Sequence, residues 1–162
     1  DVVNMASCAP LFARVDGWQW NPDLIWVDNL RSVGTPNYYV HKLFSNNRGS
    51  KVVPITLNSD VVAGQDSLYA SAAIDAATNE LIIKIVNASN KQQATTLSLE
   101  AAKKLGKIAK LTLLQSDRLD AANSFDHQDM IAPKETTVVI KNKKIDYQAL
   151  PYSFSVIRLP LF

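Results

Sequence analysis

The fold of this chain is decided by two stretches, Trp18-Gln-Trp-Asn-Pro-Asp-Leu-Ile-Trp-Val-Asp-Asn29 and Gly34-Thr-Pro-Asn-Tyr-Tyr-Val-His-Lys-Leu-Phe44. Residues 23–27 form a short, nearly continuous apolar run, which is typical of a strand with both faces covered. Thr35 is a good N-cap, and Pro36 suits the first helical position, where its missing N–H costs nothing. The two stretches therefore predict a strand, a tight loop and a helix. Such a βα unit cannot bury its own apolar surface, so we expect its partners upstream of residue 1 or in another chain.

After about residue 49 the hydrophobic pattern changes from helical to strand-like. Short β-rich runs are separated by polar or proline-containing segments, and they lie at residues 51–57, 68–74, 81–86, 94–99, 109–115, 136–140 and 153–159. The polar segment 75–80 suits a hairpin turn, in which Asn79 would take the left-handed conformation. Residues 100–106 fit a helical turn or a loop equally well. The pattern predicts a mainly β fold, an antiparallel β-sandwich of jelly-roll type.

Several motifs carry a resemblance to a known family. Residues 20–25 (Trp-Asn-Pro-Asp-Leu-Ile) and 34–45 (Gly-Thr-Pro-x-Tyr-Tyr-Val-x-Lys-Leu-Phe-Ser) resemble the end of the catalytic barrel in α-L-arabinofuranosidases of glycoside hydrolase family 51. Residues 1–12 are similar to the barrel helix before that strand. Ser124-Phe-Asp, Ile131-Ala-Pro133 and residues 150–159 resemble the C-terminal β-domain of these enzymes. The resemblance implies that residues 1–48 are the last helix, strand and helix of a (β/α)8 barrel and that residues 49–162 are a C-terminal β-sandwich domain.

The catalytic question concerns carboxyl groups, since retaining glycosidases need two of them about 5 to 5.5 Å apart. The resemblance implies that both are glutamates at the ends of earlier barrel strands. This chain has three glutamates, Glu80, Glu100 and Glu135. Asn79-Glu80 matches the Asn-Glu pair that carries the acid/base in this enzyme clan, but its neighbours favour an exposed hairpin turn. Glu100 and Glu135 are expected as solvated charges at strand edges, so we expect both catalytic residues outside this chain.

A sugar-binding wall is predicted near the tryptophans. Trp18, Trp20 and Trp26 place three indoles within nine residues, and aromatic faces commonly hold sugar rings. The resemblance implies that residues near the last barrel strand line the sugar pocket, which nominates Trp20, Asn21 and Asp23 as substrate-binding residues. The alternative is that Trp18 and Trp26 belong to the core, that Asn21-Pro22-Asp23 is a turn, and that Asp23 caps or pairs locally.

Metal and cofactor chemistry finds little support in the sequence. His41, His127 and the single Cys8 show no metal-ligand spacing, and Cys8 is expected as a buried, inert residue of the first helix. Asp126, His127 and Asp129 offer ligands for a cation, although a hydrogen-bonded surface loop is favoured. We expect no metal and no cofactor.

Charge and composition limit the partners. The net charge of +2 and the pI near 8.7 are too mild to indicate a nucleic-acid partner, and the lysines within 103–110 and 141–144 have no aromatic residue among them. No run approaches the roughly 18 apolar residues of a membrane span. The first residue is Asp1 rather than Met, which predicts a piece of a longer protein. Its compartment, extracytoplasmic or cytoplasmic, therefore stays open.

Two functional hypotheses follow. The first is the C-terminal portion of a retaining α-L-arabinofuranosidase that removes terminal α-L-arabinofuranosyl groups from arabinose-containing polysaccharides or oligosaccharides, inactive without the rest of the barrel. The second is a carbohydrate-binding or structural β-sandwich module. All three tryptophans precede Asn29, so the sandwich lacks an obvious aromatic platform, which favours the first hypothesis. Unpartnered apolar residues in the first 30 positions also predict one of two outcomes for the isolated chain: it self-associates, for example as a homo-oligomer, or it packs residues 1–48 on the sandwich in a non-barrel arrangement.

Overall fold

The computed structural model describes residues 7–17, 23–100, 102 and 104–162 of the 162-residue chain. Its elements are β1 (Phe12–Arg14), β2 (Ile25–Val27), β3 (Ser32–Gly34), α1 (Pro36–Asn46), β4 (Lys51–Val53), β5 (Thr56–Leu57), β6 (Asp60–Val61), the 3-10 turn η1 (Gln65–Ser67), β7 (Leu68–Asp75), β8 (Glu80–Asn87), β9 (Gln93–Ser98), β10 (Ile108–Gln115), β11 (Lys134–Val139), β12 (Lys144–Ala149) and β13 (Ser153–Pro160). Among the described residues, no helix is both long and apolar enough to cross a membrane.

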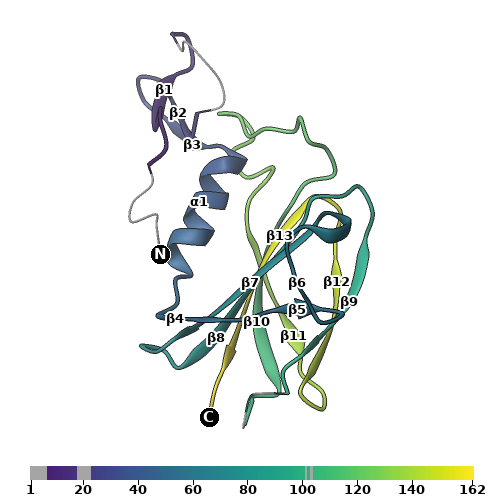
Figure 1. Cartoon of the computed structure of the whole chain (residues 1–162). Helices are drawn as coiled ribbons and strands as arrows, with labels where there is room; N and C mark the ends of the chain where they lie inside the picture. The colour runs from purple at the N-terminus through teal and green to yellow at the C-terminus, as the bar shows by residue number, and fades with distance from the viewer. Residues whose placement is uncertain (1–6, 18–22, 101, 103) are drawn as a thin grey trace.

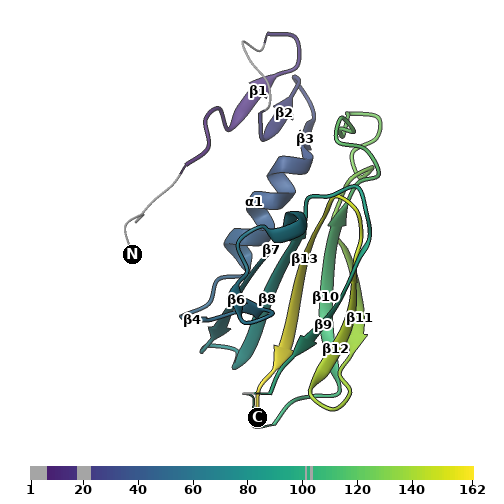
Figure 2. The ribbon, with the colours of Figure 1, turned by 45° about the vertical axis from the view of Figure 1, so that its right-hand side comes forward.

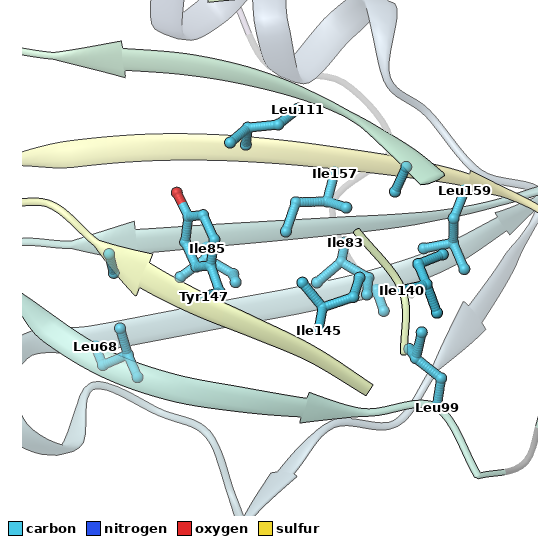
Figure 3. Close-up of a cluster of buried hydrophobic side chains, with 13 residues drawn as sticks. Leu68, Ile83, Ile85, Leu99, Leu111, Ile140, Ile145, Tyr147, Ile157 and Leu159 are labelled. Carbon is cyan, nitrogen blue, oxygen red and sulfur yellow. The ribbon is translucent and has the colours of Figure 1, made fainter. Parts of the chain in front are cut away.

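The main body is an antiparallel β-sandwich, as predicted (Figure 1). One layer is a six-stranded sheet in the order β11-β10-β13-β8-β7-β4, and the other is the pair β12-β9. Ile83 and Ile157 from the large sheet meet Ile145 and Tyr147 from β12 between the layers (Figure 3). The β12-β9 pair covers only part of the six-stranded sheet, and the β5-β6 hairpin lies beside this pair.

The outer face of the six-stranded sheet is covered as well, by α1 and the loop of residues 116–133. A second buried cluster joins this helix and loop to the sheet and consists of Leu43, Ile82, Leu114, Ile131, Phe154 and Val156. The central strand β13 is therefore buried on both faces. This explains its nearly continuous apolar run, because successive side chains of a strand point to opposite faces.

A small three-stranded sheet precedes the helix and lies beyond one end of the sandwich (Figures 1 and 2). In it β1 and β2 run parallel, and β3 pairs antiparallel with β2. The predicted strand and capped helix are confirmed. Thr35 is the N-cap, its hydroxyl accepts a hydrogen bond from the backbone N–H of Tyr38 at 3.3 Å, and Pro36 opens the helix. The predicted domain boundary at residue 48 falls between α1 and β4. The division into two domains stays a prediction.

The helix expected over residues 1–12 is wrong for the residues that the structure describes. Residues 7–11 are not helical, and residue 12 begins β1. Pro10 supplies no N–H for a helical hydrogen bond, and the backbone around Phe12 pairs with β2 instead. Cys8 is accordingly half-exposed and not in a helix. Residues 1–6 lie outside the described part of the chain.

The strand predictions for the sandwich hold, with local corrections. The β7-β8 hairpin is present, and Asn79 has a φ of 53° in its turn. The run 51–57 is divided into β4 and β5, since Pro54 cannot donate a ladder hydrogen bond. The described residues of 100–106 form no helix. Strands β3 and β12 were not predicted, although Ile145 and Tyr147 alternate with exposed residues in β12.

Candidate functional site

Polar side chains gather at the carboxyl ends of the parallel strands β1 and β2, which lie at the same edge of the small sheet. Arg14 ends β1, and its guanidinium donates to Asn29 Oδ1 at 2.8 Å and to Asp16 Oδ1 at 2.9 Å. Residues 28–31 join β2 to β3 and are here called the 28–31 turn. The side chain of Asp28 accepts hydrogen bonds from backbone N–H groups of this turn. Its Oδ1 accepts the backbone N–H of Arg31 at 2.6 Å. This edge combines two guanidinium groups with hydrogen-bonded carboxylates.

Both carboxylates at this edge favour the ionised state. The hydrogen bond from Arg14 lowers the pKa of Asp16. The backbone N–H of Leu30 lowers the pKa of Asp28, with further help from Arg31. A glycosidase general acid needs a raised pKa so that it carries a proton near neutral pH. This edge is therefore suited to binding and positioning rather than to proton transfer.

The predicted sugar-binding residues are only partly described. Trp20 and Asn21 lie outside the described residues. Asp23 is completely buried at 0% exposure, and neither carboxylate oxygen has a hydrogen-bond partner among the residues that the structure describes. Its backbone oxygen accepts from the hydroxyl of Thr35 at 3.0 Å. Asp23 lies just before β2, so it is at the opposite end of this strand from the 28–31 turn.

The sequence reasoning missed Arg14, Asp28 and Asn29 as site candidates. A signal was present, because Asp28 and Asn29 are the first polar residues after the apolar strand. In a (β/α)8 barrel the active site is built from the loops that follow the carboxyl ends of the strands. Residues that directly follow a predicted barrel strand are therefore stronger candidates than residues that precede it.

Glu80 is not the exposed turn residue that the sequence predicts. It begins β8 with 24% of its side chain exposed, and Nε of Arg158 donates to its Oε2 at 2.9 Å. The same guanidinium reaches Asp75 Oδ2 at 3.0 Å and Asn47 Oδ1 at 3.1 Å. The local context suggested a turn, but Arg158 lies 78 residues away in β13 and partly buries the carboxylate. Glu80 is thus held in an ion pair on the sandwich.

The other two glutamates are strand-edge charges, as predicted. Glu135 lies in β11, and its carboxylate pairs with Nζ of Lys110 at 2.7 Å on the exposed surface. Glu100 follows β9 and is exposed.

The loop that offered ligands for a cation is engaged in other contacts. Asp126 Oδ1 lies 3.7 Å from Nη1 of Arg31, and Asp129 interacts with the hydroxyl of Tyr39. No group of three or more metal-ligating side chains occurs within residues 7–17, 23–100, 102 and 104–162. The favoured interpretation, a hydrogen-bonded loop, agrees with these contacts.

An apolar cavity of about 340 Å³ lies between β7, β8, β9 and the β5-β6 hairpin. Its described lining consists of aliphatic residues with a few hydroxyls from residues such as Thr95 and Ser98, without any aromatic or charged side chain. Sugar sites usually combine an aromatic face with several polar groups. The cavity does not offer that combination.

Comparisons with known proteins agree over nearly the whole chain. The family model described as the α-L-arabinofuranosidase C-terminal domain matches residues 1–153. α-L-Arabinofuranosidase A of Aspergillus niger is 33% identical over 161 residues, which cover 97% of this chain and 24% of that protein. α-L-Arabinofuranosidase 1 of Arabidopsis thaliana is 30% identical over 160 residues, covering 96% of this chain and 23% of that protein.

Solved structures give the same result. An arabinose-bound GH51 α-L-arabinofuranosidase matches 95% of this chain with a TM-score of 0.84 and 28% identity, over 24% of its own length. The thermostable GH51 enzyme of Thermotoga petrophila, with a TM-score of 0.69 and 19% identity over 84% of this chain and 31% of its own, shares the fold. The chain spans about a quarter of the length of the curated relatives it matches. These matches confirm the resemblance seen in the sequence: the chain belongs to the α-L-arabinofuranosidase C-terminal domain family.

Proposed function

We propose that this chain works as the C-terminal part of a retaining α-L-arabinofuranosidase, a glycoside hydrolase that removes terminal α-L-arabinofuranosyl groups from arabinose-containing polysaccharides or oligosaccharides. The observation that carries the proposal is the match to fungal and plant arabinofuranosidases over at least 96% of the chain. The arabinose-bound structural relative, at 28% identity, supports the same substrate class.

The chemistry of retention places the reacting groups elsewhere in the parent enzyme. One carboxylate attacks the anomeric carbon while a carboxylic acid protonates the leaving oxygen, and water then releases the sugar with the second group acting as base. In this chain Glu80 and Glu135 are ion-paired on the sandwich, and Glu100 is exposed after β9 on the sandwich as well. The nucleophile and the acid/base therefore come from the remainder of the parent protein.

The role of this chain is structural and positional. Strands β1 and β2 supply a parallel pair to the barrel, and α1 joins that pair to the sandwich. The 28–31 turn then lies on the face where the sugar binds. Trp20, Asn21 and Asp23 remain proposed pocket residues, while the position of Asp23 before β2 favours a role in holding the strand over direct contact with sugar.

The proposal is tested with a longer protein that contains this chain and the rest of the barrel. We expect hydrolysis of an aryl α-L-arabinofuranoside, with the α-anomer as the first product seen by proton NMR. The matching aryl α-L-arabinopyranoside, which differs in ring size, is the control and should react far more slowly. A first product of inverted configuration, or equal hydrolysis of both ring forms, would contradict the proposal.

A further inference from the structure

We propose that the loop of residues 116–133, here called the bracing loop, positions the 28–31 turn and so sets the shape of one edge of the sugar pocket. This inference rests on the proposed function, because the turn borders a sugar pocket only in the complete barrel. It assigns a role in substrate binding to a loop of the sandwich, which otherwise serves as scaffold.

The bracing loop is anchored to the small sheet by Asn123. This side chain is only 7% exposed, and its Nδ2 donates to the backbone oxygen of Gly34 at 2.9 Å, at the end of β3. Nδ2 also donates to the oxygen of Ile131 at 2.9 Å, while Oδ1 accepts the N–H of Ile131 at 2.8 Å. A buried amide with its bonds satisfied on both sides fixes one geometry, since an unpaired arrangement would cost free energy.

The loop also reaches the 28–31 turn itself, through Arg31. The guanidinium carbon of Arg31 lies 4.7 Å from the centre of the Phe125 ring, and Nη1 lies 3.7 Å from Asp126 Oδ1. On its other side, Nε of Arg31 donates to Asp28 Oδ2 at 2.9 Å. Arg31 is thus held between the turn and the bracing loop.

The base of the loop is fixed in the hydrophobic layer between α1 and the sheet. Ile131 is 5% exposed and packs in the cluster that contains Leu43 of α1 and Leu114 of β10. Burial raises the pKa of Tyr39 in the same helix, and the nearby charge of Asp129 raises it further. Anchors at the base, in the middle and near the tip make the loop a brace between the sandwich and the small sheet (Figures 1 and 2).

A loop that only connects two strands would need no contact with Arg31, whereas the bracing loop contacts it through Phe125 and Asp126. The Phe125 and Asp126 contacts are partly exposed, so their loss should leave the fold intact. A guanidinium over an aromatic face at an exposed site stabilises by about 0.5–1 kcal/mol, which corresponds to an approximately two- to five-fold change in a local equilibrium. The effect should therefore be local, and it should appear in the turn.

The test uses the longer protein with four variants. Phe125→Leu removes the ring, Phe125→Tyr keeps it, Asp126→Asn removes the charge, and Leu119→Ala is the control because Leu119 is 80% exposed in the same loop. Hydrogen–deuterium exchange of the peptide covering residues 28–34 is measured beside kcat and KM. We expect about two- to five-fold faster exchange and a comparable rise in KM for Phe125→Leu, a smaller rise for Asp126→Asn, and wild-type values for the other two.

Equal exchange in Phe125→Leu and Phe125→Tyr would overturn the inference. A change that Leu119→Ala shares with Phe125→Leu would overturn it too, because the effect would then be a general loosening of the loop. The exchange measurement needs no turnover, so failure of the brace is distinguished from failure of the proposed function, which wild-type hydrolysis decides.

Discussion

Arg158 joins β13 to two regions that are distant in sequence, the β7-β8 hairpin and the residue that follows α1. Its guanidinium bonds Glu80 and Asp75 across the β7-β8 hairpin, Thr78 in the hairpin turn, and Asn47 just after α1. The side chains of Arg158 and Asp75 are 19% and 20% exposed, so this ion pair is better shielded from solvent than most surface pairs.

This network predicts a pH-dependent stability. The hydrogen bond from Arg158 lowers the pKa of Asp75, so the folded state favours the ionised carboxylate. The resulting stabilisation is complete above the ordinary pKa of an unfolded Asp, about 3.9, and is lost as the pH falls through the lower folded value. We expect Asp75→Asn to reduce the free energy of unfolding at pH 7 and to have little effect near pH 2, measured by urea denaturation. The same loss at both pH values would contradict the assignment.

Substitution of the buried Asp23 should change the melting temperature in opposite directions in the longer protein and in this chain alone. A buried carboxylate without a partner is costly, whereas breaking a buried ion pair is strongly destabilising. Because no described residue bonds its carboxylate, we expect the counter-group in the rest of the parent protein. Asp23→Asn should therefore lower the melting temperature of the longer protein but raise or preserve that of this chain alone. A lower melting temperature in both proteins would place the counter-group within this chain, and a higher one in both would show that Asp23 has no counter-group.

At the residue scale, local chemistry was predictable and distant pairing was not. Asn79 follows from the turn preference of its own segment, and it takes the expected left-handed conformation. The burial of Glu80 depends on Arg158, and that of Asn123 depends on Gly34, 89 residues away. Neither contact leaves a signal in the neighbouring sequence.

At the scale of elements, the helix that joins the two sheets depends on its cap. Thr35 accepts from the N–H of Tyr38, and its hydroxyl also lies 3.0 Å from the backbone oxygens of Asp23 and Leu24. Thr35→Ala removes the cap together with the contacts to the two residues before β2, and losing a cap costs about 0.5–2 kcal/mol. We expect a loss near the upper end of that range in urea unfolding. Thr35→Ser keeps the hydroxyl and is the control, and an equal loss for Ser would point to the methyl group instead.

The elements predicted from sequence were those with strong local patterns. The capped helix and the β7-β8 hairpin fall in this group, because each combines a hydrophobic period with its own start or turn signal. β1 was mistaken for the end of a helix, since three residues are too few to show a period and its pairing with β2 is the deciding contact. β12 shows a clear alternation, but the lysine-rich turn before it obscured its start.

At the scale of the whole molecule, the small sheet leaves apolar side chains in solvent. Leu30 is 94% exposed, Phe12 58% and Leu11 48%, all in or beside β1 and the 28–31 turn. Large apolar side chains that are exposed at several places on one small sheet favour association. We expect this chain alone to self-associate in sedimentation velocity, and Phe12→Ser with Leu30→Ser to reduce it. Leu119→Ser removes a similarly exposed residue from the bracing loop and should have no effect. Association that is unchanged by the double substitution would place the contact elsewhere.

The β-sandwich could be predicted from the sequence because several strands show clear hydrophobic patterns. The covering of the second face of the six-stranded sheet could not be predicted in this way. That face arises from packing of α1 and Ile131 on β13, and only the uninterrupted apolar run of β13 hinted at it. The candidate site was the least predictable part, since it depends on which end of β2 each polar residue occupies.

The most direct test of the account is hydrolysis of an aryl α-L-arabinofuranoside by this chain alone, measured beside the longer protein and beside this chain carrying Glu80→Gln. The account predicts turnover by the longer protein only, because Glu80 and Glu135 are ion-paired on the sandwich and Glu100 is an exposed residue after β9. Turnover by this chain alone that disappears in Glu80→Gln would contradict it, and would make Glu80 a catalytic residue.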